Sequence, residues 1–412
     1  MLKQLCKIAT TLTGFTLCVS TITNAALADT TPNQSLASSA LIAPTPNTKT
    51  TMPNLIPAPP NVNAKSFIVM DTDSGRIIAA KNMNMRLPPA SLTKLMTLYV
   101  IASSLQSGHI HLDDKVHISE KAWKMGGSKM FVKANDNVPV RLLIQGIIVD
   151  SGNDACVAMA QFIGGNETSF AQLMNQTAQQ LGMKNTHYVD STGLPQPDHF
   201  ATAYDLSILA RAFINNFPQY YGWFNQKWFK YNNIRQPNRN RLLWRDPSVD
   251  GLKTGHTKSA GYCLIASAKR NNMRLLSVVM GTPTDQARNN DSQALLNYGF
   301  RFYTTHKLYD ANQTITQARV WMGQQRQVRL GTHHPLFVTI PTGSYKQLKI
   351  AASTKTLTAP INKGEVSGQL SISLNGKIIQ SVPLLALNSD AQGGLFRRLS
   401  DRISLTFTGK PH

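Results

Sequence analysis

The sequence is poor in cysteine. Only four cysteines occur in 412 residues, and two of them, Cys6 and Cys18, lie close to the N-terminus. This excludes a small disulfide-rich scaffold, because Cys156 and Cys263 are the only other pair that could form a bridge. A chain of this length needs no bridge to hold its core, and two isolated cysteines are too few for a zinc site. Whether these two pair is left open by the sequence.

The sequence also lacks an apolar run long enough to cross a membrane. Its N-terminal apolar stretch, residues 8–19, is short and diluted with threonine, and a spanning helix is only the alternative here. Lys3 and Lys7 precede this stretch, and the small-residue segment 25–28 follows it. That order is typical of a signal peptide, residues 1–28, cleaved after Ala28. The sequence therefore predicts export.

Acidic residues are scarce, since 21 Asp and Glu face 42 Lys and Arg, giving a formal net charge of +21 at pH 7. Such a balance suits nucleic acid, an anionic membrane or an acidic polymer, or it serves solubility alone. The basic residues are scattered without a run or a reading motif. With export predicted, we expect no nucleic-acid partner, and we expect an anionic envelope surface and carboxylate-bearing substrates instead.

Residues 29–63 are rich in Pro, Thr, Asn, Ser and Ala without an apolar period, which predicts a flexible leader. Two β-rich runs around the turn residues 71–75 then predict a hairpin. Helical patterns follow, and more strands come after them. The expected helices are 91–104, 141–148, 154–163, 167–181, 202–217 and 291–302, and the later strands are 261–268 and 274–281. Helices enclosed by early and late strands predict an α+β domain over residues 64–304.

Short β segments replace the helices after residue 304. Expected strands include 327–330, 336–340 and 347–351. Asn375-Gly376 separates two apolar runs, the first alternating with polar residues, which predicts a tight hairpin. Together these segments predict a small all-β domain, residues 305–388, in which no chemistry is evident.

The C-terminal segment 389–412 has an amphipathic pattern. At helical spacing its large apolar residues fall within an arc of roughly 120°, with both arginines of the 397–398 pair outside it. These residues are Leu395, Phe396, Leu399, Ile403 and Phe407. The stretch is too short and too charged to span a bilayer, but it can lie in the membrane interface, with peripheral contact through residues 394–408. The alternative is a terminal helix packed on the β domain.

Three short motifs carry the chemistry, in the order Ser91-Leu92-Thr93-Lys94, Ser151-Gly152-Asn153 and Lys253-Thr254-Gly255. Each alone is weak, because a Ser-x-x-Lys is also an ordinary capped helix start. Ser91 and Lys94 lie three apart on one helix face, so the amine can take the hydroxyl proton if it is at least partly neutral. Burial and the second cation, Lys253, favour the neutral amine.

The second and third motifs supply the remaining parts of such a site. Ser151 can relay a proton to the leaving amine, and Asn153 can hydrogen bond Lys94 and a substrate amide. Gly255 leaves room for a ligand backbone, so an extended peptide can lie along this strand. A terminal carboxylate would then be bound by Lys253 and by the hydroxyl of Thr254.

These motifs, with their flanking residues 89–97, 151–156 and 250–257, resemble the low-molecular-mass penicillin-binding proteins of the serine D-alanyl-D-alanine carboxypeptidase type. The resemblance extends over roughly residues 64–387. It implies a penicillin-binding, serine β-lactamase-like transpeptidase domain that removes the terminal D-Ala from peptidoglycan stem peptides through a serine acyl-enzyme. It also implies β-lactams as covalent inhibitors, the periplasmic face of the cytoplasmic membrane, and neither metal nor organic cofactor.

The resemblance implies roles at matching positions. Ser91 would be the nucleophile, Lys94 the general base, Ser151 the second serine of the proton relay and Lys253 the substrate-binding lysine. The backbone amides of Ser91 and His256 would form the oxyanion hole.

Two arginines and one loop also match the family. Arg288 matches an arginine that orients the substrate carboxylate through Lys253 and Thr254. Arg239 is a weaker match, with a solvated surface arginine as the alternative. Residues 125–131 resemble a mobile loop beside the site.

Other polar residues have simpler interpretations. Cys156 is expected to be a small helix residue close to the site, and His256 to contribute its amide rather than its imidazole. His333-His334 has no further ligand at metal spacing.

Three other functions stay open at this point. A serine β-lactamase needs a glutamate to activate water, and between Ser151 and Lys253 only Glu167 occurs. A D,D-endopeptidase would use the same residues on a related carbonyl. A non-catalytic lactam-binding or wall-binding protein would not need all of the motifs intact.

Overall fold

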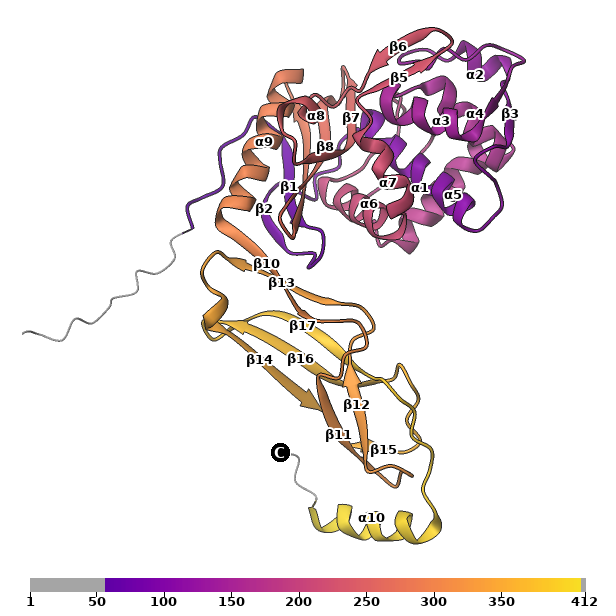
Figure 1. Cartoon of the computed structure of the whole chain (residues 1–412). Helices are drawn as coiled ribbons and strands as arrows, with labels where there is room; N and C mark the ends of the chain where they lie inside the picture. Colours follow the sequence, from indigo (N-terminus) through magenta and orange to yellow (C-terminus); the bar gives the residue numbers. More distant parts are fainter. Residues whose placement is uncertain (1–55, 409–412) are drawn as a thin grey trace, which may run out of the picture. The chain divides into compact units, whose positions relative to one another are not determined.

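The computed structural model describes residues 56–408, with side chains up to residue 406. The predicted signal peptide and most of the predicted leader lie outside these residues. The first domain is built on a five-stranded antiparallel sheet with the order β2-β1-β9-β8-β7 (Figure 1). Its strands are β1 Ser66–Asp71, β2 Ile77–Lys81, β7 Val249–Thr257, β8 Gly261–Arg270 and β9 Met273–Thr282. The predicted first hairpin and the two predicted later strands are confirmed.

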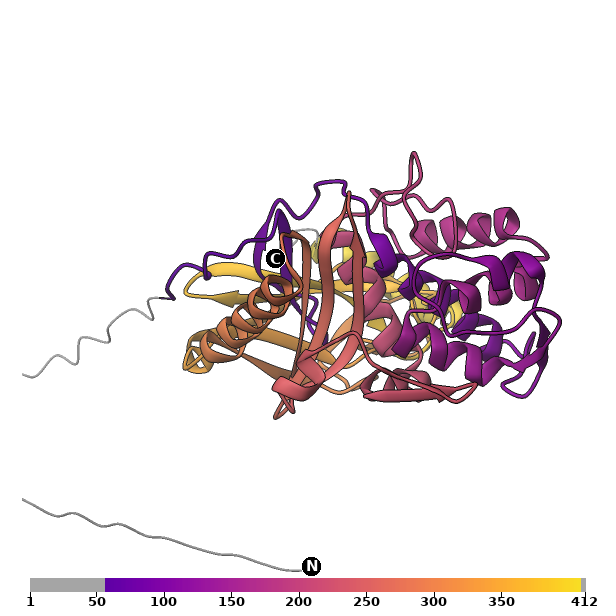
Figure 2. The ribbon, with the colours of Figure 1, turned by 90° about the horizontal axis from the view of Figure 1, so that it is seen from above.

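Both faces of this sheet are buried, which explains its almost continuous apolar strands. Alternate residues point to opposite faces: Val69 and Leu264 pack in one cluster with helix α9, Asp285–Phe302, while Ile68 and Ile265 pack in another with the main helical layer. Figures 1 and 2 show α9 on one side of the sheet and the other large helices on the opposite side.

The helical layer follows the predicted pattern closely. Its elements are η1 Ala90–Thr93, α1 Lys94–Gln106, α2 Glu120–Lys124, α3 Val140–Gln145, the π turn η2 Gly146–Asp150, α4 Asn153–Gly164, α5 Glu167–Gln180, α6 Ala203–Asn216, α7 Pro218–Tyr221, η3 Gly222–Asn225 and α8 Leu242–Arg245. The predicted helix from residue 202 is confirmed, and Thr202 caps it, since its Oγ1 accepts the Asp205 N–H at 3.0 Å.

One helix starts earlier than its pattern suggests. Helix α9 spans Asp285–Phe302, whereas apolar spacing predicted a start at 291. The Thr284 hydroxyl caps the true start by accepting the Ala287 N–H at 3.0 Å, and the polar first turns carry no apolar period. Two short strand pairs were also missed: β3 Lys115–His117 with β4 Asn137–Pro139, and β5 Trp228–Tyr231 with β6 Ile234–Pro237.

The second domain is all-β. A six-stranded sheet has the order β14-β16-β17-β12-β11-β15, and β10 pairs with β13. The elements are β10 Tyr303–Tyr309, β11 Thr316–Trp321, β12 Gln327–Gly331, β13 Leu336–Pro341, η4 Tyr345–Gln347, β14 Leu348–Thr354, β15 Leu357–Thr358, β16 Val366–Leu374 and β17 Lys377–Ala386. Asn375 and Gly376 both have positive φ, 51° and 78°, as the predicted two-residue hairpin turn requires.

Helix α10, Leu395–Thr408, follows the β domain. Within residues 56–408 no helix is both long and apolar enough to cross a membrane. The side chain of Phe407, part of the predicted apolar arc, lies outside the described side chains.

Candidate active site

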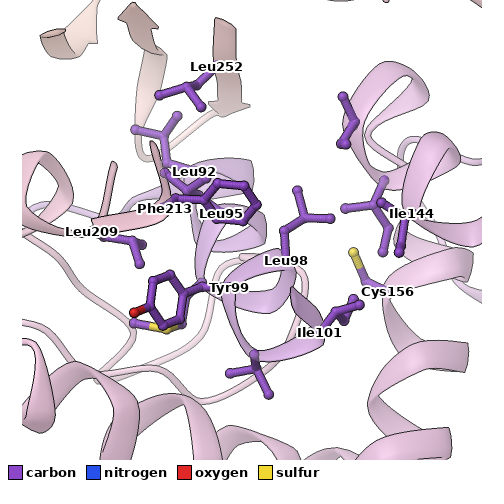
Figure 3. Close-up of a cluster of buried hydrophobic side chains, with 14 of the residues drawn as sticks. Leu92, Leu95, Leu98, Tyr99, Ile101, Ile144, Cys156, Leu209, Phe213 and Leu252 are labelled. Atoms are coloured by element: carbon purple, nitrogen blue, oxygen red, sulfur yellow. The ribbon is translucent and has the colours of Figure 1, made fainter. Parts of the chain in front are cut away.

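The turn that carries Ser91 and the helix that follows it lie inside the apolar core. Leu92, Leu95 and Leu98 are buried there, and Figure 3 shows these side chains among those of neighbouring elements. Ser91 belongs to the 3-10 turn η1 rather than to the α-helix predicted from residue 91. Such a turn places residues i and i+3 one above the other. Lys94 Nζ therefore lies 2.8 Å from Ser91 Oγ.

The hydrogen bonds of Lys94 suit a base. Its Nζ donates to Asn153 Oδ1 at 2.6 Å and to the Thr192 carbonyl at 3.0 Å, and neither oxygen has a hydrogen to give. A neutral amine has two N–H groups for these two acceptors, which leaves its lone pair for the Ser91 hydroxyl. Burial lowers the pKa of Lys94, although nearby Cys156 and Asp190 oppose the shift.

The second motif begins directly after the π turn η2, and its first residue has a left-handed backbone conformation. Ser151 has φ 58° and ψ 36° and lines the cavity over Ser91. Asn153 donates from Nδ2 to the Gly126 carbonyl at 2.6 Å, and its backbone N–H donates to the Ser128 carbonyl at 2.7 Å. The segment 125–131, predicted to lie beside the site, is thereby attached to Asn153.

The third motif lies on the edge strand β7. Lys253 is buried, and burial, followed by the charge of Lys94, lowers its pKa. A side chain at Gly255 would bring its Cβ to 3.0 Å from the Pro89 carbonyl and 3.2 Å from the Leu92 nitrogen. The glycine was predicted to leave room for a ligand backbone, but the space is taken by the Ser91 turn. Gly255 therefore lets β7 pack closely against the nucleophile.

The cavity over Ser91 has a volume of about 980 Å³. Seven of the ten predicted site residues line it, namely Ser91, Ser151, Arg239, Thr254, Gly255, His256 and Arg288. The other three, Lys94, Asn153 and Lys253, are buried beneath it. Trp228, Gln236 and Trp244 also line it and were not predicted. Trp228 and Gln236 lie on the β5–β6 hairpin. The pair Asn232-Asn233 at its turn, where both residues have positive φ, was the sequence signal for this hairpin.

The two arginines are placed differently. Arg288 is buried and donates to the Gly255 carbonyl at 3.0 Å, and it forms an ion pair with Asp285. Burial lowers its pKa. Arg239 has no hydrogen-bond or ion-pair partner among residues 56–408 and lines the cavity. Its donors are available to a ligand, whereas Arg288 supports β7 from behind.

The other polar residues considered in the sequence analysis have structural roles or contacts outside the reaction. Among residues 56–408, Cys156 and Cys263 are buried and form no disulfide. Burial raises the pKa of the Cys156 thiol to about 12, so it is an unreactive thiol. The Glu167 carboxylate pairs with Lys121. The His256 ring stacks on Tyr262. No cluster of three or more His, Cys, Asp or Glu that could hold a metal occurs in the described part of the chain.

Comparison with known proteins agrees with this geometry. A family model described as D-alanyl-D-alanine carboxypeptidase matches residues 54–284, and one described as the C-terminal domain of penicillin-binding protein 5 matches residues 303–392. The D-alanyl-D-alanine carboxypeptidase DacC of Escherichia coli is 44% identical over 358 residues, covering 84% of this chain and 89% of that protein. DacA of Haemophilus influenzae is 43% identical over 357 residues, covering 85% and 91%.

A solved structure supports the same assignment. Penicillin-binding protein 5 from Haemophilus influenzae superposes with a TM-score of 0.78 at 43% identity, covering 81% of this chain and 99% of that one. The chain therefore belongs to the D-alanyl-D-alanine carboxypeptidase family. It is a serine peptidase that removes the terminal D-alanine of peptidoglycan pentapeptides and binds penicillin. The predicted fold class and function are confirmed.

Proposed function

We propose that Lys94 activates Ser91 for acyl transfer to D-Ala-D-Ala peptides, and that the enzyme works while exported and attached to the membrane surface. The observation that carries the catalytic part is the position of Lys94 Nζ, 2.8 Å from Ser91 Oγ with two further acceptors that use its N–H groups. This amine is aimed at the hydroxyl proton before any substrate arrives.

The reaction follows from these positions. Lys94 takes the proton of Ser91, and Oγ attacks the carbonyl carbon of the penultimate D-Ala. The oxyanion is bound by the backbone amides of Ser91 and His256, an arrangement in which losing one donor costs about 3 to 4 kcal/mol. The C–N bond breaks, Ser151 passes the proton held by Lys94 to the leaving nitrogen, and D-alanine departs. Water then attacks the ester carbonyl carbon and gives a proton to Lys94, which returns it to Oγ as the C–Oγ bond breaks. The shortened peptide leaves with a new terminal carboxyl group.

The terminal carboxylate is assigned to the basic side of the cavity. Lys253 and Thr254 lie on β7, and Arg239 is the cavity arginine without a protein partner among the described residues. A guanidinium forms two parallel hydrogen bonds with a carboxylate. Arg288 acts on the carboxylate indirectly, because its Nη1 and Nη2 hold the Gly255 carbonyl and Asp285, and its Nε is buried without a partner among the described residues.

Product analysis tests the reaction and its specificity. The full chain is incubated with a synthetic pentapeptide ending in D-Ala-D-Ala and, separately, with a cross-linked peptide dimer. The Ser91→Ala variant is incubated with the same two peptides. Mass spectrometry should show the loss of one alanine from the pentapeptide and an intact dimer, with no change for the variant. Cleavage of the dimer at a comparable rate would favour the endopeptidase alternative.

Membrane attachment is assigned to helix α10. Asp401, on its polar side, accepts the Met322 N–H of the β domain through Oδ2 at 2.7 Å, and Arg397 donates to the Gln324 carbonyl at 3.2 Å. The apolar side is left uncovered, with exposed fractions of 77% for Leu395, 90% for Phe396, 60% for Leu399 and 53% for Ile403. A helix packed for its own stability would bury these residues, so their exposure supports insertion into a lipid interface.

Vesicle sedimentation tests this attachment. We expect the full chain to sediment with anionic vesicles, and both a chain ending at Gln392 and a Phe396→Asp, Leu399→Asp variant to stay in solution with peptide hydrolysis retained. Ile378→Asp is the matched control, because Ile378 is 61% exposed on β17 and outside the helix. Undiminished binding by the shortened chain would rule out α10 as the anchor.

A further inference from the structure

The loop 190–193 holds the catalytic lysine through a backbone carbonyl, that of Thr192. Asp190 shapes this loop, since its Oδ1 accepts the N–H groups of Thr192 and Gly193 at 2.6 and 2.7 Å and the Thr192 hydroxyl at 2.8 Å. Gly193 has φ +84°, and a Cβ there would lie 1.9 Å from the Ala90 carbonyl oxygen. The loop is thus packed directly on the turn that carries Ser91.

His199 joins the same loop to the Ser-x-x-Lys turn. It is 5% exposed, with Nε2 2.9 Å from the hydroxyl of Thr93, the residue before Lys94. Its Nδ1 accepts the Val189 N–H at 3.3 Å. A backbone N–H only donates, so Nδ1 carries no proton and the ring is neutral with its hydrogen on Nε2. Burial lowers the pKa of His199, while Asp190 acts in the opposite direction and His187 in the same one.

One oxygen between these residues has no partner. Asp190 Oδ2 is buried without a hydrogen bond in the described part of the chain, and it lies 3.7 Å from His199 Nδ1. A buried carboxylate oxygen without a partner is costly. Protonation of Nδ1 would give it a charged donor, at the expense of the Val189 contact. The pair therefore has two arrangements, one for each charge state of His199.

We propose that Asp190 and His199 are positioning residues for Lys94: with His199 neutral they hold the Thr192 carbonyl on the amine, and protonation of His199 draws Asp190 Oδ2 toward the ring and releases that carbonyl. Two consequences oppose catalysis at acid pH. The amine loses an acceptor that fixed its direction, and the loop that packs on the Ser91 turn shifts. This inference rests on the proposed role of Lys94 as base.

Charged groups around Lys94 influence its own titration, which is separate from that of His199. Asp190 and Asp154 face it with negative charge, Arg239 and Lys253 with positive charge, and Cys156 is adjacent. Titration of Lys94 itself therefore also contributes to the acid limb of activity. A variant at position 199 separates the two contributions, because glutamine keeps a donor for Thr93 but has no proton to gain.

The test measures the acylation rate by a fluorescent penicillin, and peptide hydrolysis, from pH 5 to 9. For the native chain we expect activity to fall on the acid side as His199 takes a proton, at a pH below the ordinary histidine range because burial lowers the pKa of His199. His199→Gln should lose this component of the acid limb and keep the component that belongs to Lys94. Asp190→Ala should lower acylation about 10- to 100-fold with little change in KM, because it misplaces the base and leaves the carboxylate contacts intact.

Two controls keep the outcomes distinct. His187→Gln changes a histidine on the same segment whose ring hydrogen bonds the Asp198 carbonyl, and its pH profile should keep the His199 component, moved toward higher pH because the charge of His187 lowers the pKa of His199. Thermal unfolding of each variant checks the fold, and Asp190→Asn, which retains the loop contacts at Oδ1, should recover most of the activity lost in Asp190→Ala. An unchanged acid limb in His199→Gln would overturn the inference. Normal acylation of Lys94→Ala would instead overturn the proposed base.

Discussion

Asp150 should make the stability of the catalytic domain fall as the pH rises. It ends the π turn directly before Ser151, is 1% exposed, and its Oδ1 has no hydrogen bond within the described residues. Burial raises its pKa from 3.8 to about 7, although Arg239 acts in the opposite direction. The folded chain therefore keeps a proton on this carboxyl that the unfolded chain has already released.

The sign and size follow from linkage. Between about pH 4 and pH 7 the folded state binds more protons than the unfolded state, so the free energy of unfolding decreases with rising pH. From pH 5 to pH 7, a span of two pH units, the free energy of unfolding decreases by about 3 kcal/mol at most. Relaxation of the surroundings reduces the figure to about 1 to 2 kcal/mol. The loss is complete about one pH unit above the folded pKa, near pH 8.

Asp150→Asn removes this dependence. We expect the Tm of the variant to gain about 2 to 4 °C relative to the native chain between pH 5 and pH 8, as followed by calorimetry of the catalytic transition. Asp246→Asn is the control. Burial alone would raise the pKa of Asp246, but hydrogen bonds from Ser248, Gln293 and Arg270 lower it to about 2, so its effect should be constant over this range. Parallel Tm curves for Asp150→Asn and the native chain would refute the reasoning.

Other predictions concern the nucleophile and its supports. Ser91 should be the residue acylated by penicillin, with a long-lived adduct because the Glu167 carboxylate is paired with Lys121; peptide mapping that finds the adduct elsewhere would contradict this. Lys94→Ala should slow acylation about 10²- to 10⁴-fold without unfolding the chain, as stopped-flow rates and melting curves would show. Lys253→Ala should also raise KM for peptides, because a carboxylate ligand is lost, and an unchanged KM would argue against that contact. Gly193→Ala should reduce acylation strongly, since its Cβ would lie 1.9 Å from the Ala90 oxygen; native rates would show that the loop can move away.

Much of this site was predictable because its chemistry is encoded locally. Ser91 and Lys94 are one turn apart, so their contact needs only the local helical geometry, and Asn153 opens the next helix of the site. The same holds for the Asn375-Gly376 hairpin, where both residues adopt the left-handed backbone that they favour.

The rest depended on contacts between distant segments. The carbonyl that holds Lys94 belongs to Thr192, and any residue has a carbonyl, so its identity gives no signal. Arg239 and Arg288 both match the family, but only the structure shows that Arg288 binds the Gly255 carbonyl and Asp285 while Arg239 is left for a ligand. Gly255 was predicted to make room for a ligand backbone, whereas in the structure it allows β7 to approach the Ser91 turn closely.

Three of the places where local rules fail lie around the cavity. Ala90, Phe131 and Ser151 are not glycines, yet all have positive φ, at 49°, 66° and 58°, a conformation that costs such residues about 1 kcal/mol or more. One precedes the nucleophile, one lies in the loop attached to Asn153, and one is the second serine. Lys94 and Lys253 are buried cations in the same region. Strain and buried charge of this kind persist only where surrounding packing fixes them. The apolar cluster around α1 supplies that packing, so the core that makes the fold stable also lowers the pKa of Lys94 and keeps its amine aimed at Ser91.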